Sequence, residues 1–389
     1  MCCAVHHRCG LAVCEPRHFA KLLSRRHGRS QIGKKLLKDF IYTGLPMRVV
    51  FGAGSIARLA EELDRLGAKR ALVLSTPGRG ESVRRVTASL GSRLAGVYDK
   101  AVMHVPVEVA EDARRVAAEL GADCCISVGG GSTTGLGKAV ALTSGLPILA
   151  VPTTYSGSEM TTVLGMTEGG TKKTLRNPRV LPRTVIYDPT LTLGLPSGIS
   201  AASGMNAIAH CVEALYAVDG NPINALQAEE GIRALAAALP VIMESPADPE
   251  ARSDALYGAW LAGVAFATVG LGLHHKLCHV LGGTFNLPHA QTHSIILPHA
   301  ARYNRDAAPQ AMARIARALG CADAPQGLYD LEAKLGLEAR LSAIGMPAEG
   351  LARAARIATE NPYENPRKVD YAGVLSLLQA AFEGQRPAA

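Results

Sequence analysis

The stretch CCISVGGGSTTGLGKAVALTSGLPILAVPTT (124–154) decides the fold of this chain. Its apolar start predicts a buried strand over 124–132 that runs into three glycines, and a helix over 133–143 follows. A second apolar run over 147–154 predicts the next strand. Strand, helix and strand in this order predict a parallel sheet wrapped by helices, since parallel neighbours need a long crossover connection. Such sheets bind ligands at the carboxyl ends of their strands, where GGGS and PTTYSGSE (152–159) lie.

The same alternation continues upstream, and the pattern changes downstream. Further strands are expected at 48–52, 70–76, 95–98 and 184–189, and helices at 55–67, 80–94 and 107–120. From about residue 197 the apolar spacing is helical, with almost no strand signal. These patterns predict an extension over 1–39, a Rossmann-like α/β nucleotide-binding domain over 40–196 and an all-helical domain over 197–385. The extension is expected to be disordered or loosely docked and to have no catalytic role.

The charge of the chain is concentrated near its start. Of the formal net charge of +8, residues 1–39 contribute +7, with nine Lys and Arg against two acidic residues. The rest of the chain holds 32 basic and 31 acidic residues, and this near-neutral balance predicts no nucleic-acid partner. The sequence has no uninterrupted apolar run of 18 residues, so no membrane span is expected. Five scattered cysteines after residue 39 favour reduced thiols and a cytoplasmic protein.

Glycines and small hydroxyl side chains mark the candidate nucleotide site. Three successive glycines before a helix let backbone N–H groups approach a phosphate, and the helix N-terminus favours negative charge. A tight strand-to-helix turn is the alternative explanation. The residues expected to bind the cofactor, NADH or NADPH, are Gly129, Gly130, Gly131, Ser132, Thr133, Thr153, Thr154, Ser156, Ser75, Thr76 and Lys172.

Two neighbouring motifs are less specific. Gly52, Gly54 and Ala57 match G-x-G-x-x-A after a strand, but the acidic ribose ligand expected about 20 residues on is missing, because the second strand ends in Ser-Thr-Pro (75–77). A basic patch around Lys172 is explained equally well as a solvated face or as a cationic rim for a nucleotide or a dianionic substrate.

A histidine-rich segment, GLHHKLCHVLGGTFNLPHAQTH (272–293), carries the candidate chemistry. It holds five of the eight histidines found after residue 39. His275 and His279 are four apart, as are His289 and His293, and this spacing places each pair on one face of a helix. Two imidazole pairs on consecutive helices can converge on one pocket, to hold a metal or to serve a substrate that needs a proton. Packed or surface histidines are the bland alternative.

Together, FGAGS, GGGST, PTTYSGSE and the histidine segment resemble the iron-containing alcohol dehydrogenase family over roughly 40–385. The resemblance implies an α/β nucleotide-binding domain, a helical domain and an active site in the cleft between them. Within this family, LPMRVVFGAG, ALVLSTP and the histidine segment are most similar to the maleylacetate reductases. That branch implies NAD(P)H-dependent reduction of maleylacetate and substituted maleylacetates to 3-oxoadipate in the degradation of aromatic compounds, by a homodimer.

One position departs from the wider family's metal-binding pattern. That pattern, an Asp with a His four residues on and two further histidines fourteen apart, falls on Asn206, His210, His275 and His289. An amide replaces the one anionic ligand, as in the maleylacetate reductases, so no metal is expected. His279 and His289 are then expected to be the proton donor and the oxyanion-stabilising group, in an order that the sequence leaves open. His210, His275 and Asn206 would complete the pocket, with His293 as an orienting residue.

Two other function classes stay open. A metal-dependent alcohol or polyol dehydrogenase of the same fold would use Asn206 as a ligand through its side-chain oxygen. A nucleotide-binding protein without catalysis would leave the histidine cluster unexplained. The expected substrate in the preferred interpretation is a small dicarboxylate.

Overall fold

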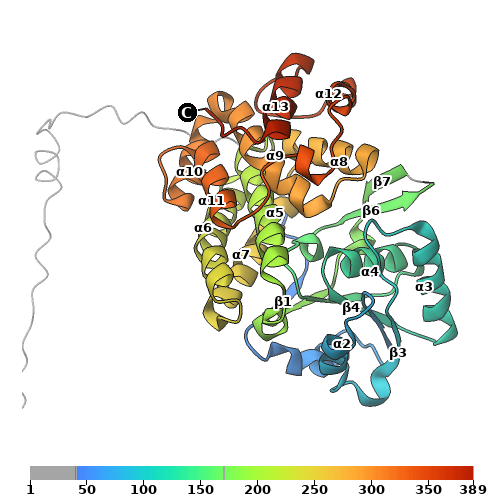
Figure 1. The fold of residues 1–389 in the computed structure, drawn as a ribbon. Helices are drawn as coiled ribbons and strands as arrows, with labels where there is room; N and C mark the ends of the chain where they lie inside the picture. Colours follow the sequence, from blue (N-terminus) through green and yellow to red (C-terminus); the bar gives the residue numbers. More distant parts are fainter. Residues whose placement is uncertain (1–39, 41, 170, 389) are drawn as a thin grey trace, which may run out of the picture. The chain divides into compact units, whose positions relative to one another are not determined.

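The computed structural model describes residues 40, 42–169 and 171–388, without the side chains of residues 171 and 172. The extension expected over 1–39 lies outside the described residues. Beyond it, the chain forms one compact unit in which an α/β part precedes an all-helical part (Figure 1).

The α/β part is built on a six-stranded parallel sheet in the order β1-β8-β5-β4-β2-β3. The predicted parallel sheet and the helical second half are thus confirmed. The strands are β1 (Arg48–Phe51), β2 (Ala71–Leu74), β3 (Leu94–Tyr98), β4 (Cys124–Gly129), β5 (Ile148–Pro152) and β8 (Thr184–Tyr187). The four central strands are almost wholly buried, as their unbroken apolar runs predict.

Helices cover both faces of this sheet, because successive strand side chains point to opposite sides. On one face, Val73 and Ile126 pack with α1 (Leu59–Arg65) and α2 (Gly80–Thr87). On the other face, Leu72 and Cys125 pack with α3 (Val107–Glu119) and α4 (Gly131–Ser144).

One local detail differs from expectation, and one lies outside the main sheet. The helix predicted over 80–94 ends at Thr87 and is followed by a 3₁₀ turn at Gly91–Arg93, where Gly91 has a φ of 52° that an α-helix does not accommodate. Between β5 and β8 the chain forms an antiparallel hairpin, β6 (Val163–Glu168) with β7 (Thr171–Arg176), which stands apart from the main sheet.

Nine helices make up the described helical part. They are α5 (Ser197–Tyr216), α6 (Pro222–Glu244), α7 (Pro249–Ala267), α8 (Leu273–Phe285), α9 (His289–Asn304), α10 (Pro309–Leu319), α11 (Ala324–Lys334), α12 (Gly350–Glu360) and α13 (Tyr371–Glu383). The last strand of the sheet ends at Tyr187 and α5 begins at Ser197, so the predicted domain division at 196/197 falls in the segment between them. The division itself stays a prediction.

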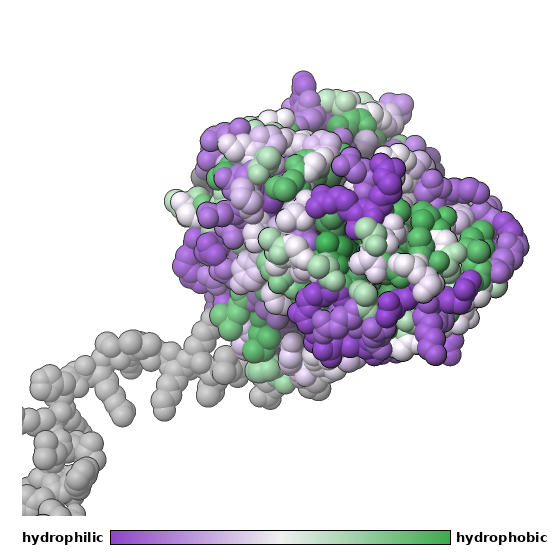
Figure 2. Space-filling view, turned by 90° about the horizontal axis from the view of Figure 1, so that it is seen from below, coloured by the Kyte–Doolittle hydropathy of each residue, from purple (hydrophilic) through white to green (hydrophobic). Residues whose placement is uncertain are grey.

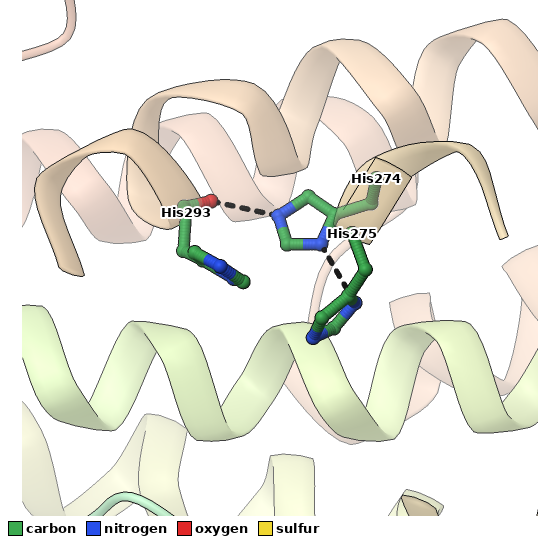
Figure 3. A group of neighbouring side chains, drawn as sticks. All are labelled: His274, His275 and His293. Atoms are coloured by element: carbon green, nitrogen blue, oxygen red, sulfur yellow. Dashed lines mark hydrogen bonds between the residues drawn. The ribbon is translucent and has the colours of Figure 1, made fainter. Parts of the chain in front are cut away.

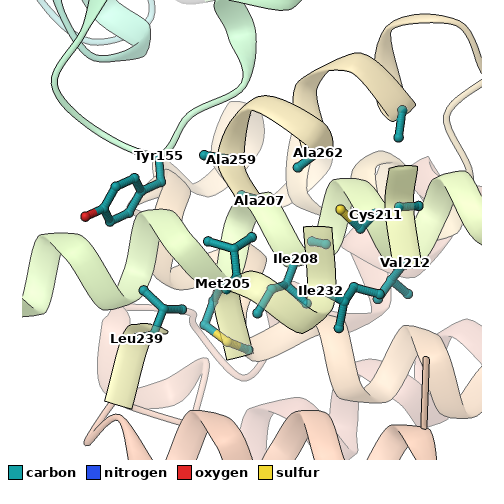
Figure 4. Close-up of a cluster of buried hydrophobic side chains, with 14 of the residues drawn as sticks. Tyr155, Met205, Ala207, Ile208, Cys211, Val212, Ile232, Leu239, Ala259 and Ala262 are labelled. Carbon is teal, nitrogen blue, oxygen red and sulfur yellow. The ribbon is translucent and has the colours of Figure 1, made fainter. Parts of the chain in front are cut away.

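The central core joins the two parts around α5, α6 and α7 (Figure 4). Tyr155, from the loop after β5, lies in the same cluster as Met205 and Ile208 of α5. The fully buried Arg252 of α7 fastens this junction: its Nη1 donates to the hydroxyls of Tyr155 and Ser200 at 3.2 and 2.7 Å. Buried guanidinium groups need such partners, so the loop after β5 is held firmly against the helical part.

The surface is mixed in character. Hydrophilic residues alternate with hydrophobic areas on the face shown in Figure 2. Among the described residues, no helix is both long enough and apolar enough to cross a membrane.

Candidate active site

A cavity of about 490 Å³ lies where the carboxyl ends of the sheet strands meet α5, α8 and α9. On the α/β side, the expected residues that line it are Thr76, Gly129, Gly130, Gly131, Ser132, Thr153, Thr154 and Ser156. On the helical side they are Asn206, His210, His275, His279, His289 and His293. One cavity therefore brings the glycine loop and the histidine cluster together.

The glycine loop forms a cradle that side chains would fill. A Cβ atom at Gly130, the N-cap of α4, would lie 2.7 Å from Oγ1 of Thr154. A Cβ atom at Gly129, whose φ is 145°, would lie 2.8 Å from Oγ1 of Thr133. In the part of the chain that the structure describes, no side chain caps the start of α4, and Gly131 and Ser132 of its first turn line the cavity. Open first-turn N–H groups beside a cavity suit a phosphate group.

The loop of the other glycine motif, at Gly52, Gly54 and Ala57, already binds a carboxylate from this chain. The carboxylate of Asp188 accepts hydrogen bonds from the backbone N–H groups of Gly54 and Ile56, both at 3.0 Å. It also accepts from the N–H of Thr190. The anion position after β1 is thus filled by a buried side chain, which leaves the loop after β4 as the phosphate cradle.

The two histidine pairs lie on consecutive helices, as their spacing predicts. His275 and His279 belong to α8, with ring centroids 6.2 Å apart, and His289 and His293 belong to α9, with centroids 4.2 Å apart. The rings of His275 and His293 are 4.9 Å apart, so the two pairs converge. The cluster is therefore one site rather than a set of separate packed histidines.

A buried carboxylate supports this cluster. Glu213 of α5 accepts hydrogen bonds from the backbone N–H groups of Gly272 and His274, at 3.1 and 2.9 Å. Its Oε2 also lies 2.7 Å from Nδ1 of His275. Glu213 therefore caps the start of α8 and fixes the orientation of the His275 ring, as carboxylates behind functional histidines commonly do.

His274 belongs to the packing around the site. Its Nε2 lies 2.9 Å from the backbone oxygen of His293, and its Nδ1 lies 3.3 Å from Nδ1 of His275 (Figure 3). The side chain is fully buried. Both ring nitrogens of His274 thus have protein partners, so this side chain serves the packing of the cluster.

Burial sets the protonation of the deepest imidazoles. Desolvation, followed by repulsion from His275 and His274, holds the pKa of His210 well below its usual value. Desolvation, followed by repulsion from neighbouring histidines, does the same to the pKa of His293. These two rings are neutral at pH 7. His293 makes ring contacts, but its nitrogens form no hydrogen bond with any described residue, so its expected orienting role stays a prediction.

Two groupings of residues could hold a metal. Asn206, His210, His275 and His289 share the cavity, and both Asn206 Oδ1 and His210 Nδ1 lack a hydrogen-bond partner among the described residues. Nothing in this first group supplies a negative charge. The second group, His274, His275 and His293, has ring nitrogens within 4.8 Å of one another. The hydrogen-bond partners of His274 occupy both of its nitrogens, so this second group is a poor cation site.

Two of the expected cofactor residues, Ser75 and Thr133, fall outside the cavity lining. Ser75 is fully buried beside the sheet, where its hydroxyl lies 3.4 Å from the backbone oxygen of Thr76. Thr133 donates from Oγ1 to the backbone oxygen of Gly130 at 2.9 Å and so stabilises the loop from inside. The side chain of Lys172 lies outside what the structure describes. Its neighbour Lys173 pairs with Glu168, as on a solvated face.

Two further groups have no clear signal in the sequence: one lines the cavity, and the other supports residues that line it. His104, from the loop before α3, lines the cavity opposite the helical part. Lys138 is fully buried and donates from Nζ to the backbone oxygens of Ser158 and Val163, at 2.7 and 2.8 Å. Desolvation lowers the pKa of Lys138 to about 7, against the attraction of Glu159. An isolated histidine and a lysine in an apolar helix carry no spacing pattern that would have marked them.

Known proteins share the sequence and the architecture of this chain. The protein family described as "Iron-containing alcohol dehydrogenase" matches residues 46–189, and the one described as "Fe-containing alcohol dehydrogenase family, C-terminal" matches residues 200–382. Maleylacetate reductase of Burkholderia cepacia is 58% identical over 351 residues, which cover 90% of this chain and 100% of that protein. The crystal structure of maleylacetate reductase from Rhizobium sp. strain MTP-10005 has 52% identity and a TM-score of 0.87, and covers 90% and 100% of the two chains. A putative alcohol dehydrogenase from Ralstonia eutropha JMP134 has 59% identity and a TM-score of 0.89 at the same coverage.

Proposed function

The chain belongs to the iron-containing alcohol dehydrogenase family, and we propose that it is a maleylacetate reductase that uses NADH or NADPH. The observation that carries this proposal is the cavity itself. It joins a phosphate cradle to a cluster of imidazoles from α8 and α9, with the uncharged Asn206 at the position of the family's anionic metal ligand. Relatives named maleylacetate reductase match over 90% of the chain, which supports the same conclusion.

The reaction needs groups that this cavity provides. Maleylacetate is an oxo-dicarboxylate with a C=C bond conjugated to its ketone. The bound NAD(P)H supplies a hydride to the alkene carbon remote from the ketone. The ketone oxygen then takes the negative charge of an enolate, and a proton delivered to the carbon between them gives 3-oxoadipate. Hydrogen-bond donors at the oxygen and one proton donor at the carbon are therefore required.

His279 and His289 are the proposed pair for these two tasks. They stand on different helices and line the same cavity, so one can hold the enolate oxygen while the other donates the proton. His275, oriented by Glu213, and the neutral His210 and Asn206 complete the wall. The described lining contains no acidic residue, so nothing there repels the two carboxylates of the substrate or the phosphates of the cofactor.

The cofactor-binding end supports the use of both nucleotides. The cradle at Gly129–Gly131 fits a pyrophosphate because added Cβ atoms would close it. Beside it, Thr76, Arg79 and Ser82 line the cavity, and β2 ends in Ser-Thr-Pro (75–77) instead of the acidic residue that would repel a 2′-phosphate. We therefore expect NADH and NADPH both to be used.

A resident metal is not required in this proposal. Imidazoles and an amide lack the anionic ligand that helps to hold a divalent cation, and an enolate can be stabilised by hydrogen bonds instead. The alternative is a metal-dependent alcohol or polyol dehydrogenase, in which the cation polarises a carbonyl.

The test is the oxidation of NADH and of NADPH with maleylacetate, before and after removal of metals by a chelator. We expect turnover with both nucleotides and an unchanged rate after chelation. Loss of activity that stoichiometric zinc or iron restores would contradict the metal-free mechanism. Reduction of simple aldehydes without turnover of maleylacetate would favour the alcohol dehydrogenase, and no turnover at all would favour a binding protein.

Two further points belong to the same proposal. The described cysteines are all free thiols, and four of the five are buried, which supports a cytoplasmic setting. A homodimer is proposed from the family resemblance alone, and size-exclusion chromatography with light scattering tests it.

A further inference from the structure

A second cavity of about 300 Å³ adjoins the first. Three imidazoles, those of His104, His279 and His289, line both cavities. The proposed catalytic pair thus stands on the boundary between them. A substrate whose ketone oxygen meets this pair has room on two sides, toward the glycine loop and into the second cavity.

The histidine on the α/β side of this boundary is held in an unusual backbone conformation. His104 and Val105 have φ angles of 66° and 46°, a region that residues other than glycine rarely adopt and that is particularly unfavourable for a β-branched side chain. The hairpin fixes this conformation: Thr167 donates from Oγ1 to the backbone oxygen of His104 at 3.1 Å, and from its N–H to that of Val105 at 3.2 Å. Strained residues held by their surroundings cluster at functional sites.

The lining of the second cavity suits a carboxylate. Besides the three imidazoles it presents the hydroxyl of Thr284 and the amide of Asn286, and no acidic residue is among its described lining. Room is provided by Gly282 and Gly283 of α8. Gly283 follows His279 by four residues and so lies on the same helix face, and a Cβ atom there would meet nothing within 4 Å.

We propose that this second cavity binds the acetate arm of the substrate, with His104 as the residue that positions its carboxylate. The inference rests on the proposed function. In maleylacetate the hydride-accepting carbon and the acetate arm lie on opposite sides of the ketone. When the ketone oxygen meets His279 and His289 and the alkene faces the nucleotide, the acetate arm extends through the boundary into the second cavity. A carboxylate held there fixes the distance between the alkene and the nucleotide.

Filling the cavity is the first test. Gly283→Leu should lower kcat/KM for maleylacetate by about tenfold or more while the KM for NADH stays within about twofold. Gly283→Ala, which adds one methyl group at a helical position, should have a smaller effect in the same direction. Gly198→Leu is the matched control, because Gly198 is an exposed helical glycine that lines neither cavity and whose Cβ would also meet nothing within 4 Å.

Substrate selectivity is the second test. The probe is maleylacetate with the carboxylate of its acetate arm blocked as a methyl ester. The unmodified enzyme should prefer the diacid by about tenfold or more in kcat/KM. His104→Asn, which keeps a residue that tolerates positive φ but shortens the side chain, should narrow this preference by raising the KM of the diacid more than that of the ester.

The outcomes separate the possibilities. Normal kinetics of Gly283→Leu, or an unchanged diacid preference in His104→Asn, would overturn the proposal. A fall in kcat/KM of either variant that is equal for the diacid and the ester would also overturn the proposal. It would identify the second cavity as an entry path for the substrate. If the unmodified enzyme does not reduce maleylacetate at all, it is the proposed function that fails. Circular dichroism and thermal unfolding of each variant identify a folding defect, and Gly283→Ala then carries the test.

Discussion

At the scale of single residues, the two boundary histidines should dominate the chemistry. We predict that His279→Ala and His289→Ala each lower kcat by about 10²–10⁴, the usual range for a proton donor or an oxyanion-stabilising group. Steady-state kinetics with maleylacetate and NADH measure the loss, and Lys276→Ala, on the same helix but outside both cavities, is the control. The melting temperature should change little, because neither side chain belongs to a hydrophobic cluster. A kcat within about threefold of the unmodified enzyme would assign the chemistry to other residues.

Replacing Asn206 tests the metal-free mechanism by adding a metal ligand instead of removing a functional group. Its Oδ1 is buried, lines the cavity beside His210, His275 and His289, and has no hydrogen-bond partner among the described residues. Asn206→Asp restores an anionic ligand, so we predict tighter binding of zinc or iron. The bound cation should occupy the imidazoles and reduce reductase activity. Metal analysis after dialysis and titration calorimetry measure the affinity, with Asn206→Ala as control. Equal metal content in the two variants would count against this prediction.

The sequence identifies the histidines but not the groups that hold them. A spacing of four residues is a local signal, and it is enough to predict that both pairs lie on helix faces. Glu213 carries no such signal, because its partners, Gly272 and His274, are about sixty residues away in the chain and meet it only in the folded protein. His104 was missed for the same reason. Ser75 was included because it ends a strand, yet its side chain points into the packing instead of the cavity.

At the scale of elements, the prediction was most successful where apolar patterns were long. The central strands and the helices α3 and α4 are close to their expected ranges because burial on one or both faces fixes their residue pattern. Glycines in the left-handed region account for the ends that differ, as at Gly91. Motif matching favoured the glycine loop after β4, because the match after β1 lacked the acidic ribose ligand. It could not predict that Asp188, from the end of β8, caps the loop after β1, since the bonded residues are more than 130 positions apart in the chain.

The packing of α9 against α11 contains a titratable group that the mechanism does not use. Glu332 of α11 is buried, and its Oε1 accepts from the hydroxyl of Ser294 at 2.8 Å. Desolvation raises the pKa of Glu332 from 4.5 to about 8. A carboxyl group with a raised pKa binds its proton more tightly when folded. Its stabilising contribution is therefore complete below pH 4.5 and is lost as the pH rises through about 8.

Glu332→Gln removes this titration while it keeps an oxygen that accepts from Ser294. We predict that the unfolding free energy of the unmodified protein falls relative to the variant between pH 4.5 and 8, by up to about 1.4 kcal/mol per pH unit. Urea unfolding at several pH values measures the difference. Ser294→Ala should raise the pH at which the stabilising contribution of Glu332 is lost, because the hydrogen bond from Ser294 lowers the pKa of Glu332. If the difference in unfolding free energy between the unmodified protein and Glu332→Gln does not vary with pH, the carboxyl group of Glu332 is not desolvated in this way.

At the scale of the whole molecule, two parts with different patterns form one site. The α/β part supplies the cradle and the His104 loop, and the helical part supplies the imidazoles and Asn206. Tyr155, Ser200 and Arg252 fasten the two parts together at a position remote from the histidines. Sequence patterns predicted each part separately. The contacts that bring them together depend on single buried polar groups, which no periodicity marks.

The first 39 residues should be dispensable for both folding and activity. All four hydrophobic clusters of the described chain fall between residues 47 and 382, and the site residues lie within the same range. The relatives named maleylacetate reductase match 349 to 351 residues of this chain and 99–100% of their own length. A chain of residues 40–389 should therefore keep the kcat, the KM and the melting temperature of the full chain. Its formal net charge falls from +8 to +1, so it should elute earlier from a cation exchanger, which serves as the internal check that the basic segment is gone. Insoluble expression of the shortened chain, or a melting temperature lowered by more than about 5 °C, would show that these residues contribute to the folded protein.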